Sequence, residues 1–364
     1  MLSNTEIDAI YIHVPFCIRK CGYCDFLSFP VDTCDVDKYI HHLVKEIKMY
    51  DQYSYDTVYI GGGTPSILDI KYIKYILENI NIRENAEITI EVNPKTVDLY
   101  RLRYYKALGI NRISIGVQSF NDAYLKILGR THDSNTAINT YDNARKAGFD
   151  NISLDLMFSL PQETLDGLDK DLDKLFELYP EHFSIYSLIW EENTPFYERL
   201  KKGELKETDN DMEAQMYERI IDRARGSGYV QYEISNFARS NHFSRHNMKY
   251  WENKKYVGVG LGAAGYIGDI RYKNIRDING YYSMLDTDVF PIVEKEKISA
   301  EDNEKYSAIL NLRMLQKGFL PRSDAHKNIC ERLKMKGMLD NKDDHYILTR
   351  KGLLIANDVM EEFL

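Results

Sequence analysis

The segment that decides the fold is HVPFCIRKCGYCDF, residues 13–26, which continues a short apolar stretch, Ala9–Val14. Its cysteines, Cys17, Cys21 and Cys24, are separated by three residues and then by two, so one tight loop can direct all three thiols at a single inorganic centre. Thiolates are ligands for zinc and for iron–sulfur clusters. Structural zinc normally has four protein ligands, and His13 or Cys34 would have to supply the fourth. Three ligands on a four-iron cluster leave one iron open, so the spacing favours a [4Fe–4S] cluster, with zinc as the alternative.

The composition is that of a globular protein. Hydrophobic residues make up 44% and charged residues 28% of the 364 positions, and the formal net charge is −9. An acidic chain without runs of like charge is not suited to nucleic acid or to anionic membranes. No apolar run reaches the roughly 18 residues of a membrane span, and Met1–Asp8 does not resemble a signal peptide, so we expect a cytoplasmic protein. Five cysteines in a reducing compartment favour metal binding over disulfides.

Short apolar runs alternate with longer amphipathic segments in the first half of the chain. The runs predict strands at Ala9–Val14, Thr57–Ile60, Glu87–Val92, Arg112–Val117, Asn151–Phe158 and Phe183–Ile189. The segments between them predict helices at Val36–Tyr50, Ile70–Asn79, Val97–Leu108, Asn135–Ala147 and Leu165–Leu178. Six strand–helix rounds indicate an α/β fold with a parallel sheet, a partial (β/α)6 barrel, whose chemistry gathers at the C-terminal ends of the strands.

Glycine-rich and polar motifs follow the predicted strands at those ends. Gly61-Gly62-Gly63-Thr64-Pro65 follows the second strand, where glycines let the backbone approach a ligand closely, although a simple turn is the alternative. Further candidates are Glu91, Gln118, Arg130 and Asp155. Asp155 lies within an otherwise apolar strand, and a buried carboxylate needs a partner or a ligand.

This combination resembles the radical S-adenosylmethionine (SAM) superfamily, in which CxxxCxxC follows the first strand of a βα repeat. The flanking YIHVPFC and YCDF are similar to the oxygen-independent coproporphyrinogen III oxidase family. The resemblance implies that the open iron binds the amino and carboxylate groups of S-adenosyl-L-methionine. It also implies that an electron donor reduces the cluster and the sulfonium is cleaved to methionine and a 5′-deoxyadenosyl radical. The cofactor carries that chemistry, and the protein orients it.

The resemblance implies a role for each candidate. Tyr11 and Glu91 would line the cofactor pocket and Tyr23 would lie by the adenine. Gln118 would meet the ribose and Arg130 would pair with the methionyl carboxylate, a role that suits a guanidinium fork. The remaining implied contacts are the amino-group-binding motif of Gly61, Gly62, Gly63 and Thr64, and the polar contact at Asp155.

The chain departs from the family pattern in one loop. Where the family reads GLPG, this sequence has Ser159-Leu160-Pro161-Gln162, so both glycines are replaced and the loop geometry at this edge is left open.

Two positions distinguish the branches of this family. The oxidases resemble CxxxCxxCxC with a long N-terminal extension, whereas Phe26 occupies the further cysteine position here and Cys17 is near the first residue. HNxxYW, residues 246–251, resembles the motif that marks the HemW-type haem chaperone branch, and so implies haem as cargo. His246 could ligate the iron, and Tyr250 and Trp251 offer flat apolar surface. The alternatives are a structural histidine at this position, or ligation by the nearby His242 or Met248.

The sequence divides into three predicted regions: a radical SAM core at 1–228, an irregular segment at 229–299 that contains HNxxYW, and a winged-helix-like module at 300–364. In the last, helical patterns at Asp302–Gln316 and Ser323–Lys336 precede a hairpin-like segment, Met338–Thr349, and a final helix. Because it has no cluster of Lys and Arg, we expect this module to be a structural cap and not to bind DNA.

Three functions remain in competition. The first is a haem chaperone that binds a [4Fe–4S] cluster, S-adenosyl-L-methionine and haem or porphyrin, and passes haem to recipient haemoproteins, including membrane-bound ones. The second is an enzyme that decarboxylates coproporphyrinogen or performs another radical reaction. The third is a metal-stabilised binding module. Phe26 and HNxxYW favour the first, and the sequence sets no oligomeric state.

Overall fold

The computed structural model describes residues 7–364, so most of the segment compared above with a signal peptide lies outside the described residues. One twisted sheet forms the centre of the molecule, with the strand order β11-β1-β4-β5-β6-β7-β8-β10-β9. Its strands are β1 Ala9–Val14, β4 Tyr55–Gly62, β5 Ile82–Val92, β6 Arg112–Gln118, β7 Ile152–Phe158, β8 His182–Ser187, β9 Val230–Gln231, β10 Asn236–Ala238 and β11 Val257–Val259. The neighbours from β11 to β8 pair in parallel, and the last two pairings are antiparallel.

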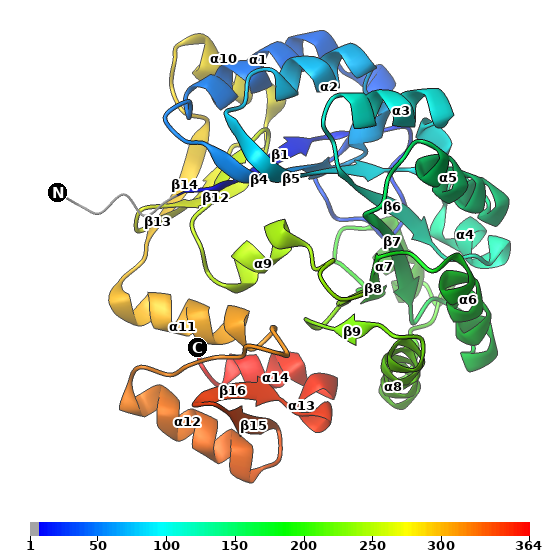
Figure 1. Cartoon of the computed structure of the whole chain (residues 1–364), viewed down its shortest axis with the longest axis vertical. Coiled ribbons are helices and arrows are strands. Elements are labelled where there is room, and N and C mark those ends of the chain that lie inside the picture. The colour runs from blue at the N-terminus through cyan, green and yellow to red at the C-terminus, as the bar shows by residue number, and fades with distance from the viewer. Residues whose placement is uncertain (1–6) are drawn as a thin grey trace.

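Helices cover the outer face of this sheet, as Figure 1 shows for α1–α6. The helices of the first part are α1 Val36–Lys48, α2 Ile70–Leu77, α3 Leu99–Ala107, α4 Asp122–Leu128, α5 Ser134–Lys146, α6 Leu165–Leu178, α7 Pro195–Lys201 and α8 Asn210–Gly226. Many begin after an acidic cap; Asp35, Asp98 and Asp133 each accept a first-turn backbone N–H. Fully buried β-branched residues such as Ile12, Ile90 and Ile115 fill the space between the sheet and the helices. The six strands and five helices predicted from sequence are confirmed within a few residues at their ends.

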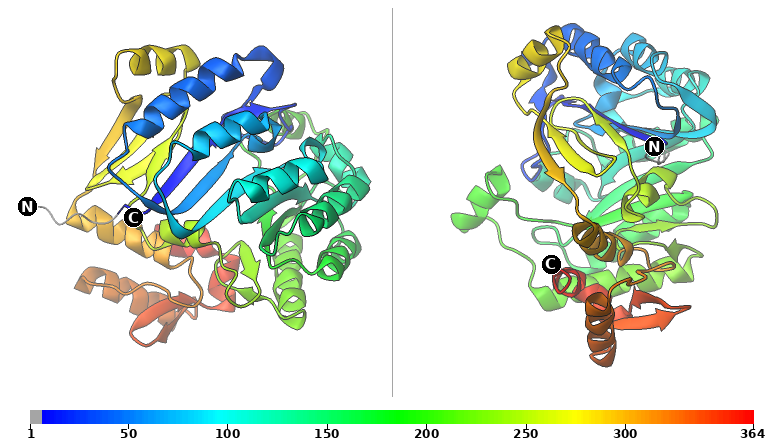
Figure 2. Two further views of the ribbon diagram at one scale, coloured as in Figure 1. Left: turned by 45° about the horizontal axis from the view of Figure 1, so that its top comes forward. Right: turned by 90° about the vertical axis from the view of Figure 1, so that its left-hand side faces the viewer.

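The prediction of an irregular segment after Tyr229 was wrong. This region contains the sheet strands β9, β10 and β11, the helices α9 Arg245–Trp251 and α10 Ile278–Asp286, and a second antiparallel sheet of β12 Ala264–Ile267, β13 Ile270–Asn274 and β14 Ile292–Lys297. Strand β11 pairs in parallel with β1, so it extends the main sheet at its first edge. In Figure 2 the yellow strands of this region lie beside the blue β1. Short strands next to glycines carry little periodicity, which is why the sequence pattern missed them.

The C-terminal module has its own core. It consists of α11 Ala300–Asn311, α12 Asp324–Met335, the hairpin β15 Leu339–Lys342 and β16 His345–Leu348, and α13 Arg350–Leu354 with α14 Ala356–Glu361. Buried residues including Leu312, Phe319 and Val359 form a cluster separate from that of the main sheet. The helix–helix–hairpin–helix order matches the winged-helix-like expectation. Among the described residues, no helix is both long and apolar enough to cross a membrane.

Candidate functional site

The cysteine loop lies at the C-terminal ends of the strands. Cys17 ends a two-residue strand, β2 Phe16–Cys17, which pairs in parallel with β3 Phe29–Pro30, so the segments before and after the loop lie side by side. All three cysteines line a cavity of about 470 Å³. The loop between them is fixed by the N–H of Phe196, which donates to the carbonyl of Gly22 at 2.9 Å. The three thiols therefore share one cavity, although among residues 7–364 no three His, Cys, Asp or Glu side chains are placed so that they could already hold a metal ion.

The glycine motif follows β4 and packs directly against Cys17. The Gly63 N–H donates to Val14 O at 2.9 Å, the Thr64 N–H to Phe16 O at 2.7 Å, and the Thr64 hydroxyl to Cys17 Sγ at 3.5 Å. A Cβ on Gly63 would lie 2.7 Å from Phe16 O and 3.0 Å from Cys17 Sγ. A side chain at position 63 would have to displace one of these neighbours, so the close packing against the cysteine loop requires glycine there. Gly62, Gly63 and Thr64 line the cavity, and Gly61 is buried behind them.

Glu91 is the penultimate residue of β5 and is held by the neighbouring strand β4. Its carboxylate accepts from the Tyr59 hydroxyl at 2.9 Å and from the Gly62 N–H at 3.1 Å. Burial raises the pKa of Glu91 to about 7. Tyr59 lines the cavity, whereas the predicted Tyr11, its register partner on β1, hydrogen-bonds His13 through its hydroxyl at 2.9 Å. Tyr59 was not among the residues predicted from sequence, although it lies two residues before Gly61 and therefore on the same face of the strand.

Gln118, Arg130 and Tyr23 surround the cavity beside Cys21. Gln118 follows a bulge in the β6–β7 pairing and has a φ of 69°. This left-handed conformation costs free energy for residues other than glycine. Arg130 donates through Nη2 to Gly116 O at 2.8 Å and through Nη1 to Cys21 Sγ at 3.5 Å. Burial raises the pKa of Tyr23 well above its usual range, although the Arg130 charge opposes that shift. A fixed cation thus lies next to a predicted cluster ligand.

Asp155 lies on β7 in the interior of the barrel. Its carboxylate accepts from Ser114 Oγ at 2.8 and 3.0 Å and from Ser153 Oγ at 3.1 Å. Burial raises the pKa of Asp155, and the serine hydroxyls and the Arg112 charge counter it. Arg112, another cavity residue that the sequence analysis did not select, is 2% exposed.

The loop that replaces GLPG keeps a glycine-like backbone. Ser159 has a φ of 61° and Gln162 a φ of 67°. Both are left-handed values, which glycine adopts without steric cost. The backbone at positions 159 and 162 therefore has the conformation that glycine favours, although both residues here are not glycine.

His246 does not present its imidazole to the cavity. The side chain is 0% exposed; Nδ1 is 2.9 Å from Thr57 Oγ1 and Nε2 is 2.7 Å from the Tyr250 hydroxyl. Burial lowers the pKa of His246 to about 3, so the ring is neutral. The N–H groups of Arg245 and His246 donate to Glu87, which fixes the start of α9 against β5. In Figure 1, α9 lies between the sheet and α11. Ligation of haem by His246 would require α9 to move.

The structure also bears on the zinc alternative. His13 Nε2 lies 2.9 Å from Leu27 O and its Nδ1 contacts Tyr11, so neither ring nitrogen is free for a metal in this conformation. Cys34 contacts the Thr33 hydroxyl at 3.7 Å and is separate from the residues that line the cavity. Neither proposed fourth ligand accompanies the three cysteines.

Comparison with known proteins places this site in a class. The family model described as the radical SAM superfamily matches residues 11–175. The solved structure of coproporphyrinogen III oxidase (HemN) from Escherichia coli superposes with a TM-score of 0.86 at 23% identity, covering 100% of this chain and 91% of that chain. The chain thus contains a radical SAM domain at residues 11–175 and has the HemN-type fold.

Closer relatives define the branch. The haem chaperone HemW of Bacillus subtilis is 36% identical over 373 residues, covering 97% of this chain and 98% of that protein. HemW of Mycobacterium tuberculosis is 32% identical over 367 residues, covering 98% and 94%. The chain belongs to the HemW family of haem chaperones.

Proposed function

We propose that this protein binds a [4Fe–4S] cluster on Cys17, Cys21 and Cys24, S-adenosyl-L-methionine at the open iron, and haem as cargo. The observation that carries the proposal is that three thiols, a glycine cradle fitted against Cys17 and the guanidinium of Arg130 share one cavity at the strand ends. When bound, the cluster and S-adenosyl-L-methionine supply one-electron cleavage of the sulfonium, driven by an external electron donor.

The chain's own residues would hold the cofactor by polar contacts. Arg130 suits the methionyl carboxylate because it is fixed beside Cys21 by Gly116 O. Backbone groups of Gly62 and Gly63 suit the amino group, and Glu91, already within reach of that backbone, would add a negative charge. The other proposed contacts are Tyr23 at the adenine, Gln118 at the ribose, Tyr11 behind Tyr59 at the pocket wall, and Asp155 deeper in the barrel.

The haem proposal rests on the family and on the mouth of the cavity. Four residues that line it are large and exposed: Ile18, Phe26, Tyr186 and Ile189, at 46, 65, 43 and 67%. Exposed apolar side chains gathered at one opening mark a binding surface for an apolar partner. Phe26, which stands in place of the oxidases' further cysteine, is among them. A flat porphyrin is a ligand of the right chemistry for this rim.

The remaining parts of the proposal concern setting and partners. The protein would act in the cytoplasm, accept electrons from a reductase and transfer haem to haemoproteins, including membrane-bound ones, without nucleic acid. Residues 300–364 would act as a cap whose helix α11 supports α9; Asn311 Nδ2 donates to Trp251 O at 2.6 Å. Because β9–β11 complete the main sheet, the core would extend past 228 into the 229–299 segment.

Anaerobic reconstitution of the wild type, Cys17→Ala and the matched control Cys34→Ala tests the cluster. We expect about one four-iron cluster in the wild type and in Cys34→Ala, and much less iron in Cys17→Ala. Unchanged iron in Cys17→Ala would contradict the assignment.

Two further measurements separate chaperone from oxidase. Haem titration should give a Soret shift with the wild type. An anaerobic assay with reductant, S-adenosyl-L-methionine and coproporphyrinogen should give no protoporphyrinogen. Formation of that product would make the protein an oxidase, the function of the E. coli protein that shares its fold.

A further inference from the structure

Arg112 is a buried cation that forms no ion pair with any residue in the described part of the chain. It begins β6, and its side chain belongs to the series Arg112, Ser114, Gly116 and Gln118, all of which line the cavity. It is 2% exposed, and its Nε and Nη1 are buried without a hydrogen-bond partner among the described residues. Burying a charge without pairing it is costly. Such a group would be stabilised by an anionic ligand.

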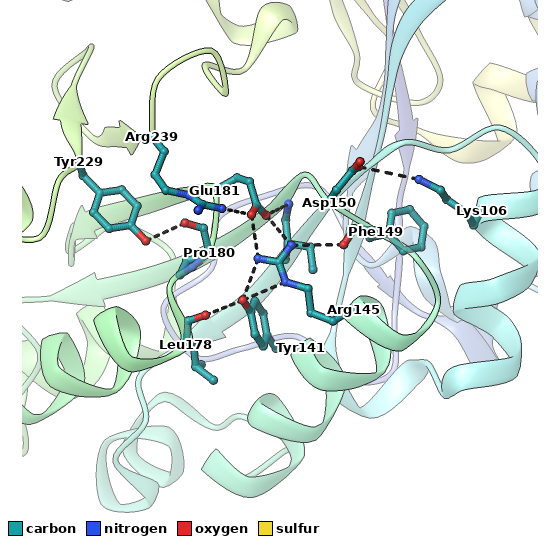
Figure 3. Close-up of polar contacts among 11 residues, drawn as sticks. Lys106, Tyr141, Arg145, Phe149, Asp150, Leu178, Pro180, Glu181, Tyr229 and Arg239 are labelled. Atoms are coloured by element: carbon teal, nitrogen blue, oxygen red, sulfur yellow. Dashed lines mark hydrogen bonds and ion pairs between the residues drawn. The ribbon is translucent and has the colours of Figure 1, made fainter.

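Elsewhere in the chain, two partly buried arginines are paired with a carboxylate. Figure 3 shows Arg145, whose Nη1 and Nη2 lie 2.7 and 3.0 Å from Glu181 and whose Nε donates to the Tyr141 hydroxyl at 3.0 Å. Arg239 binds the same carboxylate of Glu181. Both guanidinium groups of that cluster therefore have a carboxylate partner. Within residues 7–364, Arg112 has no carboxylate partner of this kind.

The charged neighbours of Arg112 do not replace a counterion. Glu91 and Asp155 face the cavity from β5 and β7, and the Arg112 charge lowers the pKa of both against the larger effect of burial. Neither forms an ion pair with Arg112 among residues 7–364, and Asp155 is already bonded to two serines. Burial lowers the pKa of His182 and of His246, and the Arg112 charge adds to both shifts, so the two rings are neutral.

A second unpaired donor lies beside it. Thr89 is the register partner of Arg112 on β5, is 0% exposed, and its hydroxyl has no hydrogen-bond partner among the described residues. Two adjacent donors, one of them cationic, suit the two oxygens of a carboxylate.

We infer that Arg112, assisted by Thr89, forms a carboxylate subsite at the floor of the cavity. The inference rests on the proposed function, whose ligands supply two kinds of carboxylate: the propionates of haem and the methionyl group of S-adenosyl-L-methionine. Arg112 is four residues from Gly116 along β6, roughly 13 Å at strand rise. Since Gly116 O fixes Arg130 beside the cysteines, the methionyl carboxylate is already served there. The spacing favours a haem propionate at Arg112.

The test compares Arg112→Met, Arg112→Lys and the control Arg101→Met. Arg101 binds the carbonyls of Ser66 and Leu68 and is separate from the residues that line the cavity. Each protein is titrated with haem, with haem dimethyl ester and with S-adenosyl-L-methionine. We expect Arg112→Met to weaken haem binding on the order of 10- to 100-fold and to change the affinity for the ester by no more than about twofold. The haem affinity of Arg112→Lys should lie between those of Arg112→Met and the wild type. Arg101→Met should match the wild type.

Other outcomes are equally decisive. Loss of S-adenosyl-L-methionine affinity alone would keep the carboxylate subsite and assign it to that cofactor. Equal loss for haem and its ester, or no loss for any ligand, would overturn the inference. Thermal unfolding of the ligand-free proteins gives an independent readout. Removal of an unpaired buried cation should not destabilise Arg112→Met, whereas a purely structural arginine would.

Failure of the proposed function is distinguishable. If the wild type binds neither haem nor S-adenosyl-L-methionine, that function is wrong. The subsite is then decided by propionate ions alone, which should raise the unfolding temperature of the wild type and not that of Arg112→Met. Equal shifts in the two proteins would remove the subsite as well.

Discussion

The contact between the glycine motif and the cysteine loop makes a sharp prediction for Gly63→Ala. The added methyl group would lie 2.7 Å from Phe16 O and 3.0 Å from Cys17 Sγ. The first neighbour is backbone and cannot rotate away, so β2 and with it Cys17 must shift. Overpacking of this kind costs about 1–3 kcal/mol. Because Cys17 is displaced directly, we expect loss of both stability and cluster binding.

A matched control separates the local effect from that of adding a methyl group. Gly226 ends α8, and a Cβ there would have nothing within 4 Å. Gly226→Ala should be neutral or stabilise by about 0.5–1 kcal/mol, as expected for alanine in a helix. Its iron content should equal that of the wild type.

The assay combines urea unfolding of the apoproteins with iron and sulfide content after anaerobic reconstitution. Gly63→Ala should unfold at lower urea and bind substantially less iron. Wild-type stability together with wild-type iron content in Gly63→Ala would refute the fitted contact between the glycine motif and Cys17.

Three other predictions follow from strained, titratable and buried groups. Gln162→Gly should stabilise the protein by about 1 kcal/mol, because Gln162 has a φ of 67°, whereas Gln215→Gly within α8 should destabilise it by a similar amount. If urea unfolding showed changes of the same sign for both variants, this prediction would be wrong. Burial raises the pKa of Glu163 from 4.5 to about 8, so the native state keeps a proton that the unfolded state loses, and stability falls as pH rises through that window. Relative to the wild type, Glu163→Gln should therefore become more stable as the pH rises through this window, by up to about 1.4 kcal/mol per pH unit. A difference in unfolding free energy that does not change with pH would count against this. His246→Ala should destabilise the protein on the order of 2–4 kcal/mol, because it leaves a cavity and unpairs Tyr250, whereas His242→Ala, at a partly exposed position, should cost little. Equal unfolding midpoints would show that the His246 contacts are not stabilising.

Local features of the sequence were sufficient for the parallel core and for most of the site. Strands buried on both faces are continuous apolar runs, and the helices between them carry caps and periodic faces, so both are legible in short windows. Residues that follow successive parallel strands necessarily meet at one edge of the sheet. For that reason the cysteines, the glycine motif, Gln118 and Arg130 could be grouped before any tertiary structure was known.

What the sequence by itself determined is therefore the class of fold, the cluster-type cysteine loop and the edge of the sheet where the cavity opens. Only the tertiary structure decided which side chains fill the barrel interior. Tyr59 and Arg112 stand within ordinary strand patterns, and their place in the cavity depends on pairing with strands far away in the chain. The same holds for His246. Its motif suggested a haem ligand, but the packing of α9 against Thr57 and Glu87 buries the side chain. Burial and counterion pairing are properties of distant segments brought together, so no local pattern reports them.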